Sequence, residues 1–198
     1  MRRCIVAGAS PEFFWDARWE PEAVICADGG AENALALGLK PDVVIGDRDS
    51  YGRADIALPA EKDMTDMEAC IDYALQTGFE EIALLGASGG RLDHFLGNIG
   101  LLERAGERAF ILDRNHEIRM ANGRPYTVGP PHRYRYFSVV PLDETVTGVT
   151  VTGAKYTLDH AALRRAATVG VSNEPLPGQS LAVSVKNGKA LLIFCEKV

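Results

Sequence analysis

Short apolar runs alternate with helical patterns over the first two thirds of this 198-residue chain, and this alternation limits the possible folds more than any other feature. The apolar runs, which predict strands, are Cys4–Ala7, Ala23–Ala27, Asp42–Ile45, Glu81–Leu85 and Arg108–Leu112. Strands that are apolar on both sides are buried on both faces, as in a parallel sheet covered by helices. The sequence therefore predicts an α/β domain with a mostly parallel sheet and helices on both faces.

Helix signals lie between these strands. Residues 31–37 form a short helical pattern that stops at Gly38, because glycine commonly follows a helix C-terminus. Thr65-Asp66-Met67-Glu68 has the capping-box pattern, and apolar residues then recur every four positions until Gly78. A third helix is predicted over residues 93–104.

The chain changes character at about Asn122. Glycine and proline become frequent, and the segments Tyr134–Val140 and Thr145–Thr152 have the alternating or β-branched character of strands. Asn187-Gly188 lies between two apolar runs and is typical of a type I′ hairpin. We therefore predict two domains, residues 1–122 and 123–198, the second a small antiparallel β-sandwich.

Composition excludes several classes of protein. The chain is 46% hydrophobic and 24% charged, which is typical of a globular protein and not of a disordered one. No apolar run approaches the roughly 20 residues of a membrane span, and no signal peptide is recognised. The net charge of −6 disfavours nucleic-acid binding. Four cysteines without short spacing indicate reduced thiols in a cytoplasmic protein.

Acidic residues are concentrated at the predicted carboxyl ends of the strands. Residues 28–72 contain eleven acidic and only four basic side chains. Carboxylates follow three strands or precede the capped helix: Asp28, Asp47, Asp49, Asp63, Asp66 and Asp93. Open α/β sheets bind ligands at this edge. Any one of these residues alone is explained by a turn or a cap, but the group as a whole favours a cation site.

Asp47 and Asp49 are the most specific part of this group. Two residues apart in extended backbone, they are expected to point the same way, so a cation between them would relieve their repulsion. Oxygen-only ligands suit Mg²⁺, which commonly shares phosphate oxygens with a nucleotide. Lys62 is compatible with a surface position, and its place beside Asp63 and Asp66 also suits a phosphate contact.

The segment Gly86–Arg91 is a glycine loop after a predicted strand. It lacks the Walker and dinucleotide patterns, but its backbone N–H groups and Arg91 are suited to phosphate. The same residues match G-x-S-x-G, the nucleophile elbow, which would make Ser88 the nucleophile of a hydrolase. That alternative leaves the acidic residues unexplained.

Five segments, in order, resemble the motifs of the thiamine pyrophosphokinase family. They are Ala27–Ala31, Pro41–Ser50, Lys62–Asp66, Gly86–His94 with Asn98, and Gly170–Glu174. Together they span most of the chain. The resemblance implies an α/β nucleotide domain followed by a β-sandwich, a homodimer, and transfer of pyrophosphate from ATP to thiamine with AMP as the other product.

The resemblance also implies roles for individual residues. Asp47, Asp49 and Asp66 would hold Mg²⁺, and Asp66, Asp93 and Arg91 would act in catalysis, with Asp66 or Asp93 as a candidate proton acceptor. Thiamine would be bound by Ser172, Asn173 and Asp93. ATP would be bound by Asp28, Gly29, Gly30, Ser50, Lys62, Asp63, Thr65, Gly89, Gly90 and Arg91.

One position departs from the family pattern. Arg48 stands in the middle of the Asp-x-Asp motif, where the family usually has an apolar residue. In extended backbone it would point away from the two carboxylates, so metal binding would survive. Three alternatives stay open: a pyrophosphokinase for another heteroaromatic alcohol such as a pterin, a non-catalytic sensor of thiamine or nucleotide, and a serine hydrolase.

Overall fold

The structure is a computed structural model that describes residues 1–16, 19–121 and 123–196. The chain divides into two units, Met1–Arg114 and Asn115–Val198. The sequence places the change near Asn122, which lies outside the described residues. In the structure the second unit begins before strand β7 (His116–Ala121). The reason is that β7 pairs antiparallel with β13 (Ala190–Cys195), a strand of the second unit.

The first unit is built on parallel strands in the order β4-β3-β2-β1-β5-β6. Their bounds are β1 Arg3–Ala7, β2 Ala23–Ala27, β3 Val43–Gly46, β4 Ile56–Ala57, β5 Glu81–Leu85 and β6 Ala109–Leu112. The sequence predicts five of these strands, whereas β4 has two exposed residues and no apolar run to indicate it. The α/β prediction is confirmed.

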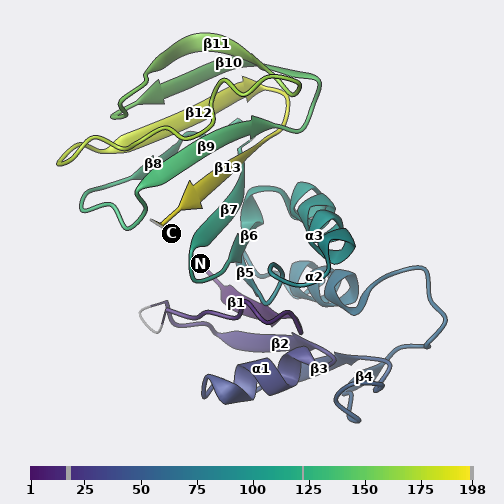
Figure 1. Cartoon of the computed structure of the whole chain (residues 1–198). Helices are drawn as coiled ribbons and strands as arrows, with labels where there is room; N and C mark the ends of the chain where they lie inside the picture. The colour runs from purple at the N-terminus through teal and green to yellow at the C-terminus, as the bar shows by residue number, and fades with distance from the viewer. Residues whose placement is uncertain (17–18, 122, 197–198) are drawn as a thin grey trace. The chain divides into compact units, whose positions relative to one another are not determined.

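Three α-helices connect strands in the part of this unit that the structure describes: α1 (Gly30–Ala36), α2 (Asp66–Gln76) and α3 (Leu92–Ala105). Figure 1 shows α1 on one side of the strands and α2 and α3 on the other, as predicted. Thr65 caps α2 by accepting a hydrogen bond from the N–H of Glu68 (3.1 Å). The Glu68 carboxylate pairs with Arg104 (2.5 Å) and so links α2 to α3.

Aromatic residues between β1 and β2 cover part of the sheet on the side where α1 lies. Phe13, Phe14, Trp15 and Trp19 pack against the sheet core there. The indole of Trp19 contacts the ring of Phe110 edge-on, with centroids 6.0 Å apart. A short 3₁₀ turn, Gly106–Arg108, joins α3 to β6.

The second unit is a β-sandwich of two antiparallel sheets. One has the order β7-β13-β9, with β9 at Tyr136–Pro141, and the other has the order β11-β10-β12-β8. The strands of the latter are β8 Tyr126–Val128, β10 Thr145–Thr152, β11 Leu158–Arg164 and β12 Leu181–Asn187. The predicted antiparallel β-sandwich is confirmed.

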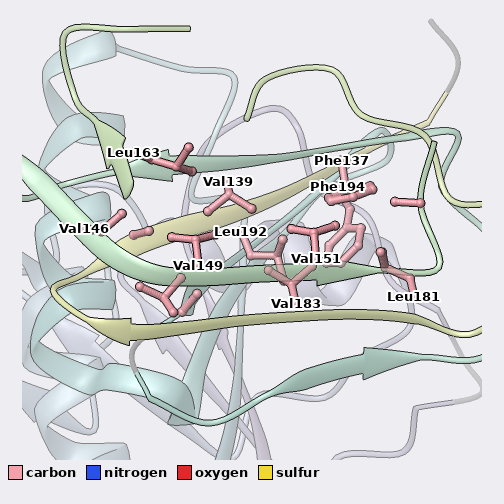
Figure 2. Close-up of a cluster of buried hydrophobic side chains, with 14 of the residues drawn as sticks. Phe137, Val139, Val146, Val149, Val151, Leu163, Leu181, Val183, Leu192 and Phe194 are labelled. Carbon is pink, nitrogen blue, oxygen red and sulfur yellow. The ribbon is translucent and has the colours of Figure 1, made fainter. Parts of the chain in front are cut away.

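The core of the second unit lies between its two sheets (Figure 2). Phe137 and Phe194 come from one sheet, and Val149, Val183 and Leu163 from the other, all of them nearly inaccessible to solvent. Full burial of side chains of this size stabilises a fold by about 1.5–3 kcal/mol each. The sandwich therefore has a hydrophobic core made of its own residues.

The predicted Asn187-Gly188 hairpin is wrong. Strand β12 pairs with β10 and β8, whereas β13 pairs with β7 and β9, so the turn carries the chain from one sheet to the other. Of the two turn residues, only Gly188 has a positive φ (86°), whereas a type I′ turn needs both. Both strands bury alternate residues in one core, a pattern that strands of two facing sheets and neighbouring strands of one sheet share. Among the described residues, no helix is long and apolar enough to cross a membrane.

The buried cysteines of the first unit give a direct test of how that unit is packed. Cys4, Cys26 and Cys70 are fully buried, and burial raises the pKa of Cys4 and of Cys26 to about 12 and that of Cys70 well above its usual range. At pH 8 a thiol with that pKa is ionised to roughly one part in ten thousand. In the native protein we expect a disulfide-exchange reagent such as DTNB to react with Cys195 at most, and with all four thiols in guanidinium. Rapid reaction of two or more thiols in the native protein would contradict the packing.

Candidate active site

The carboxyl ends of the parallel strands surround a cleft of about 550 Å³ in the first unit. This volume suits a small-molecule ligand. Nine residues selected from the sequence for ATP, metal or catalysis line it: Asp28, Gly29, Asp49, Ser50, Thr65, Asp66, Gly90, Arg91 and Asp93. The sequence-based expectation that these loops meet at one edge is therefore met for these residues.

Asp28 organises the floor of this cleft. It follows β2, is buried, and has a positive φ of 38°. Its carboxylate accepts hydrogen bonds from the backbone N–H groups of Ser50 (2.9 Å) and Tyr51 (3.3 Å). Gly46 leaves the room for this side chain, since a Cβ there would lie 2.6 Å from the Cβ of Asp28. Asp28 thus fixes the loop after β3 to the end of β2.

The expected extended conformation of Asp47–Asp49 is wrong. Strand β3 ends at Gly46, and Arg48 has a left-handed φ of 72°. The turn is held because the N–H of Asp49 donates to Asp47 (3.3 Å) and the hydroxyl of Ser50 donates to Asp49 (2.8 Å). A turn, and not strand alternation, therefore brings the two carboxylates together and leaves the Arg48 side chain exposed.

A divalent cation fits the carboxylates gathered by this turn. Single oxygens of Asp28, Asp47 and Asp49 lie within 4.8 Å of one another. An all-oxygen, acidic donor set is the kind that Mg²⁺ prefers. The sequence-based set was Asp47, Asp49 and Asp66, so the structure brings Asp28 into the group and places Asp66 at its side.

Lys62 connects Asp66 to this group. Its ammonium lies 3.0 Å from the Asp47 carboxylate and 3.2 Å from that of Asp66, with all three side chains largely buried. The hydrogen bond from Lys62, followed by that from the N–H of Asp49, holds the pKa of Asp47 below its usual range. Burial raises the pKa of Asp66, although Lys62 opposes the shift. The two carboxylates therefore differ in proton affinity.

The glycine loop is held from both sides. The Asn98 side-chain amide on α3 donates to the carbonyl of Ala87 (2.8 Å), and the N–H of Ser10 donates to that of Gly86 (3.1 Å). Side chains at the glycines would collide with the segment after β1: Gly86 with the backbone of Gly8, Gly89 with Glu12, and Gly90 with Ser10. Close packing of the two loops therefore requires these glycines.

Ser88 does not have the surroundings of a nucleophile. It is buried, and its hydroxyl donates to the buried carboxylate of Asp113 (2.7 Å), the residue after β6. A nucleophile elbow instead exposes the serine and directs its proton to a histidine. The geometry thus gives Ser88 a structural role, fixing the glycine loop to the end of β6.

Arg91 and Asp93 form an exposed pair at the start of α3. The guanidinium donates to both carboxylate oxygens, at 3.1 and 2.6 Å. Arg91 lowers the pKa of Asp93 to about 2. Asp93 is therefore a weak proton acceptor, whereas Arg91 stands at the cleft with a positive charge.

In the second unit, Asn173 and Ser172 follow Gly170, which has a φ of 100°. The Asn173 side chain is buried and bonds both backbone groups of Tyr156. Its amide donates to the carbonyl of Tyr156 (2.6 Å), and its oxygen accepts from the N–H of Tyr156 (3.0 Å). The side chain of Tyr156 remains 61% exposed. Ser172 is exposed, with a φ of 60° and an N–H that donates to the hydroxyl of Ser138.

Several predicted residues take other positions, and some cleft residues were missed. Lys62 and Asp47 form an ion pair and are not among the residues that line the cleft. Gly30 packs against the carbonyl of Ala7, and Asp63 is exposed. The missed residues include Gly8–Pro11, which line the cleft after β1. The rule that ligands bind after strand ends would have found that segment.

Two family models match the chain in succession. "Thiamin pyrophosphokinase, catalytic domain" matches residues 16–111, and "Thiamin pyrophosphokinase, vitamin B1 binding domain" matches residues 116–191. The junction between them agrees with the division of the structure at Arg114.

Individual proteins agree with this result. The chain is 34% identical over 164 residues to a thiamine pyrophosphokinase of Bacillus subtilis, covering 76% of this chain and 77% of that protein. It is 26% identical over 193 residues to thiamine pyrophosphokinase 1 of Oryza sativa subsp. japonica, covering 75% and 70%.

Solved structures show the same likeness over the whole chain. The crystal structure of the Bacillus subtilis thiamine pyrophosphokinase has a TM-score of 0.88 at 29% identity, with all of both chains covered. That from Geobacillus thermodenitrificans has a TM-score of 0.85 at 33% identity, covering 100% of this chain and 98% of the other. By its sequence and its fold, the chain belongs to the thiamine pyrophosphokinase family.

Proposed function

We propose that this protein transfers the pyrophosphoryl group of ATP to the hydroxyethyl group of thiamine, yielding thiamine diphosphate and AMP. The observation that carries the proposal is the cleft of the first unit, where an acidic cluster and a glycine loop face one another. Family membership adds thiamine as the acceptor. We assign ATP and Mg²⁺ binding to residues 1–122 and thiamine binding to residues 123–198.

The polyphosphate of ATP is proposed to lie between the glycine loop and the acidic cluster. Backbone N–H groups at the start of the 14-residue helix α3 and the Arg91 guanidinium are suited to its charge. Ser50 and Thr65 offer hydroxyl groups at the opposite wall. The proposed ATP site consists of Asp28, Gly29, Gly30, Ser50, Lys62, Asp63, Thr65, Gly89, Gly90 and Arg91.

The metal is proposed to be Mg²⁺, held by Asp47, Asp49 and Asp66 with Asp28 beside them. When bound there, Mg²⁺ would neutralise phosphate charge and align the polyphosphate for attack. The protein contributes positioning, because Asp28 holds the loop that carries two of the ligands.

The thiamine hydroxyl must lose a proton as it attacks the β-phosphorus. Asp66 and Asp93 are the two candidate acceptors, because both carboxylates line the cleft. Asp93 is held ionised by Arg91, with a pKa of about 2, so we assign it to positioning Arg91 and thiamine. Loss of the Lys62 contact would raise the proton affinity of Asp66 further.

We propose that the protein is a homodimer in which the second domain of one subunit completes the site of the other. Exposed apolar side chains in both units support a second copy as partner: Leu92 and Leu96, 69% and 61% exposed on α3, and Val169 and Val171 near Ser172. In the thiamine site, Ser172 would bind the pyrimidine and Asn173 would hold Tyr156 in place. The four free cysteines support a cytoplasmic location.

The experiment that tests the proposal is a product assay with Mg²⁺, ATP and a panel of heteroaromatic alcohols. We expect AMP and thiamine diphosphate in equal amounts, and a kcat/KM for thiamine that exceeds that for a hydroxymethylpterin by at least about a hundredfold. Preference for the pterin would support the other pyrophosphokinase. Binding of thiamine with no product would support a sensor.

Asp49→Asn is expected to reduce kcat at least about a hundredfold, because it removes a charged metal ligand, while the melting temperature changes little. Steady-state kinetics at several Mg²⁺ concentrations measure the effect. Asp159→Asn, the same change at an exposed position of the second unit, is the matched control and should retain activity. Near-normal turnover of Asp49→Asn at ordinary Mg²⁺ would contradict the metal assignment.

Ser88→Ala is expected to retain activity within about tenfold, or 1.4 kcal/mol of activation free energy. It should lower the free energy of unfolding by about 1–3 kcal/mol, since the Asp113 carboxylate loses a buried donor. Kinetics and urea unfolding measure the two effects. Complete loss of activity in folded protein, or covalent labelling of Ser88 by a fluorophosphonate, would support the hydrolase instead.

Ser172→Ala and Asn173→Ala are expected to differ. Ser172→Ala should raise the thiamine KM with little change in melting temperature, because its side chain is exposed. Asn173→Ala should do both, raising the thiamine KM and lowering stability, because three backbone hydrogen bonds depend on its oxygen and amide. The ATP KM should stay unchanged in both variants. An unchanged thiamine KM in both would remove this segment from the thiamine site.

A further inference from the structure

Lys62 has surroundings that a lysine reserved for phosphate would not need. Its side chain is only 14% exposed, and its ammonium stands between the carboxylates of Asp47 and Asp66, at 3.0 and 3.2 Å. Asp47 in turn belongs to the group of three carboxylates suited to a divalent cation. A fixed positive charge therefore already lies at the edge of the proposed metal site.

The electrostatic balance explains why this charge is useful. Asp28, Asp47, Asp49 and Asp66 together carry four negative charges around a partly buried site, and mutual repulsion would push their loops apart. Other partners of these carboxylates are neutral donors: backbone N–H groups for Asp28 and Asp47, and the Ser50 hydroxyl for Asp49. Among the described contacts of these four carboxylates, Lys62 supplies the positive charge.

The same charge also opposes a metal ion. Lys62 and a divalent cation would share the Asp47 carboxylate, and two like charges at neighbouring positions on one carboxylate weaken each other's binding. A lysine side chain has rotatable bonds enough to move its ammonium from a carboxylate to a phosphate oxygen. The position of Lys62 is thus compatible with exchange between two anionic partners.

We propose that Lys62 is a positioning residue that serves as the internal counter-ion of the acidic cluster. It holds Asp47 and Asp66 together before the metal binds, and it then gives up Asp47 to the metal and turns toward the ATP phosphates. Consequently the site favours metal that arrives with nucleotide over free metal. This inference depends on the proposed function only for the identity of the phosphate ligand, ATP.

The test uses the full chain with Lys62→Met, which keeps an unbranched side chain one atom shorter than lysine and removes its charge. Lys40→Met is the matched control, the same change at an exposed lysine in the same unit. Calorimetry measures the binding of Mn²⁺ without nucleotide and, separately, the binding of Mg·ATP; thermal unfolding is measured with and without Mg²⁺. Neither measurement requires thiamine or turnover.

Opposite effects on two ligands are the expected signature. Lys62→Met should bind free Mn²⁺ about threefold to tenfold more tightly, since a competing charge is gone, yet bind Mg·ATP more weakly. Its melting temperature without metal should fall by several degrees, and Mg²⁺ should restore more of it than in the wild type. Lys40→Met should match the wild type throughout.

Unchanged or weaker binding of free Mn²⁺ by Lys62→Met would overturn the inference, because a residue that only contacts phosphate or only supports the fold would have those effects. If Lys62→Met does not fold, Lys62→Gln and Lys62→Arg take its place, and the neutral variant must bind free Mn²⁺ more tightly than the charged one. A failure to form thiamine diphosphate would contradict the proposed function and leave the Mn²⁺ result unaffected.

Discussion

The site depends first on the buried carboxylate of Asp28, which accepts hydrogen bonds from the backbone N–H groups of Ser50 and Tyr51. Charged acceptors form the stronger class of hydrogen bond, and their loss in a buried place is costly. Through these two bonds the end of β2 determines the path of the loop after β3. Asp47 and Asp49 therefore converge on Asp28 because these two hydrogen bonds hold the backbone of their loop.

The sequence was sufficient for the fold wherever burial decides the outcome. Strands buried on both faces, the Thr65 cap and the change to short β segments predicted an α/β unit and a sandwich. It failed at Asn187-Gly188, because local turn statistics cannot say whether two strands are neighbours in one sheet or face each other across a core. The same pattern of alternate burial serves both arrangements.

The site was predictable in its members and less so in its geometry. The rule that ligands bind after parallel strands selected Asp28, Asp47 and Asp49, which the structure brings together. It also selected Asp63, which lies outside the cleft, and it was applied with Asp47 and Asp49 in extended backbone. The positive φ of Arg48 has no signal in an arginine, since glycine or asparagine usually marks such a position. The glycines of Gly86–Arg91 were expected for phosphate, whereas contacts with the segment after β1 also require them. Such contacts depend on tertiary packing, which spacing alone does not show.

The most direct test of the account is a crystal structure of the protein with Mn²⁺ and a non-hydrolysable ATP analogue, recorded where manganese scatters anomalously. We expect an anomalous peak bound by oxygens of Asp47, Asp49 and Asp66, close to Asp28. The polyphosphate should extend toward Arg91 at the start of α3. A manganese peak elsewhere, or a nucleotide bound away from the cleft that these residues line, would contradict the central claim that this edge of the sheet is the site of pyrophosphoryl transfer.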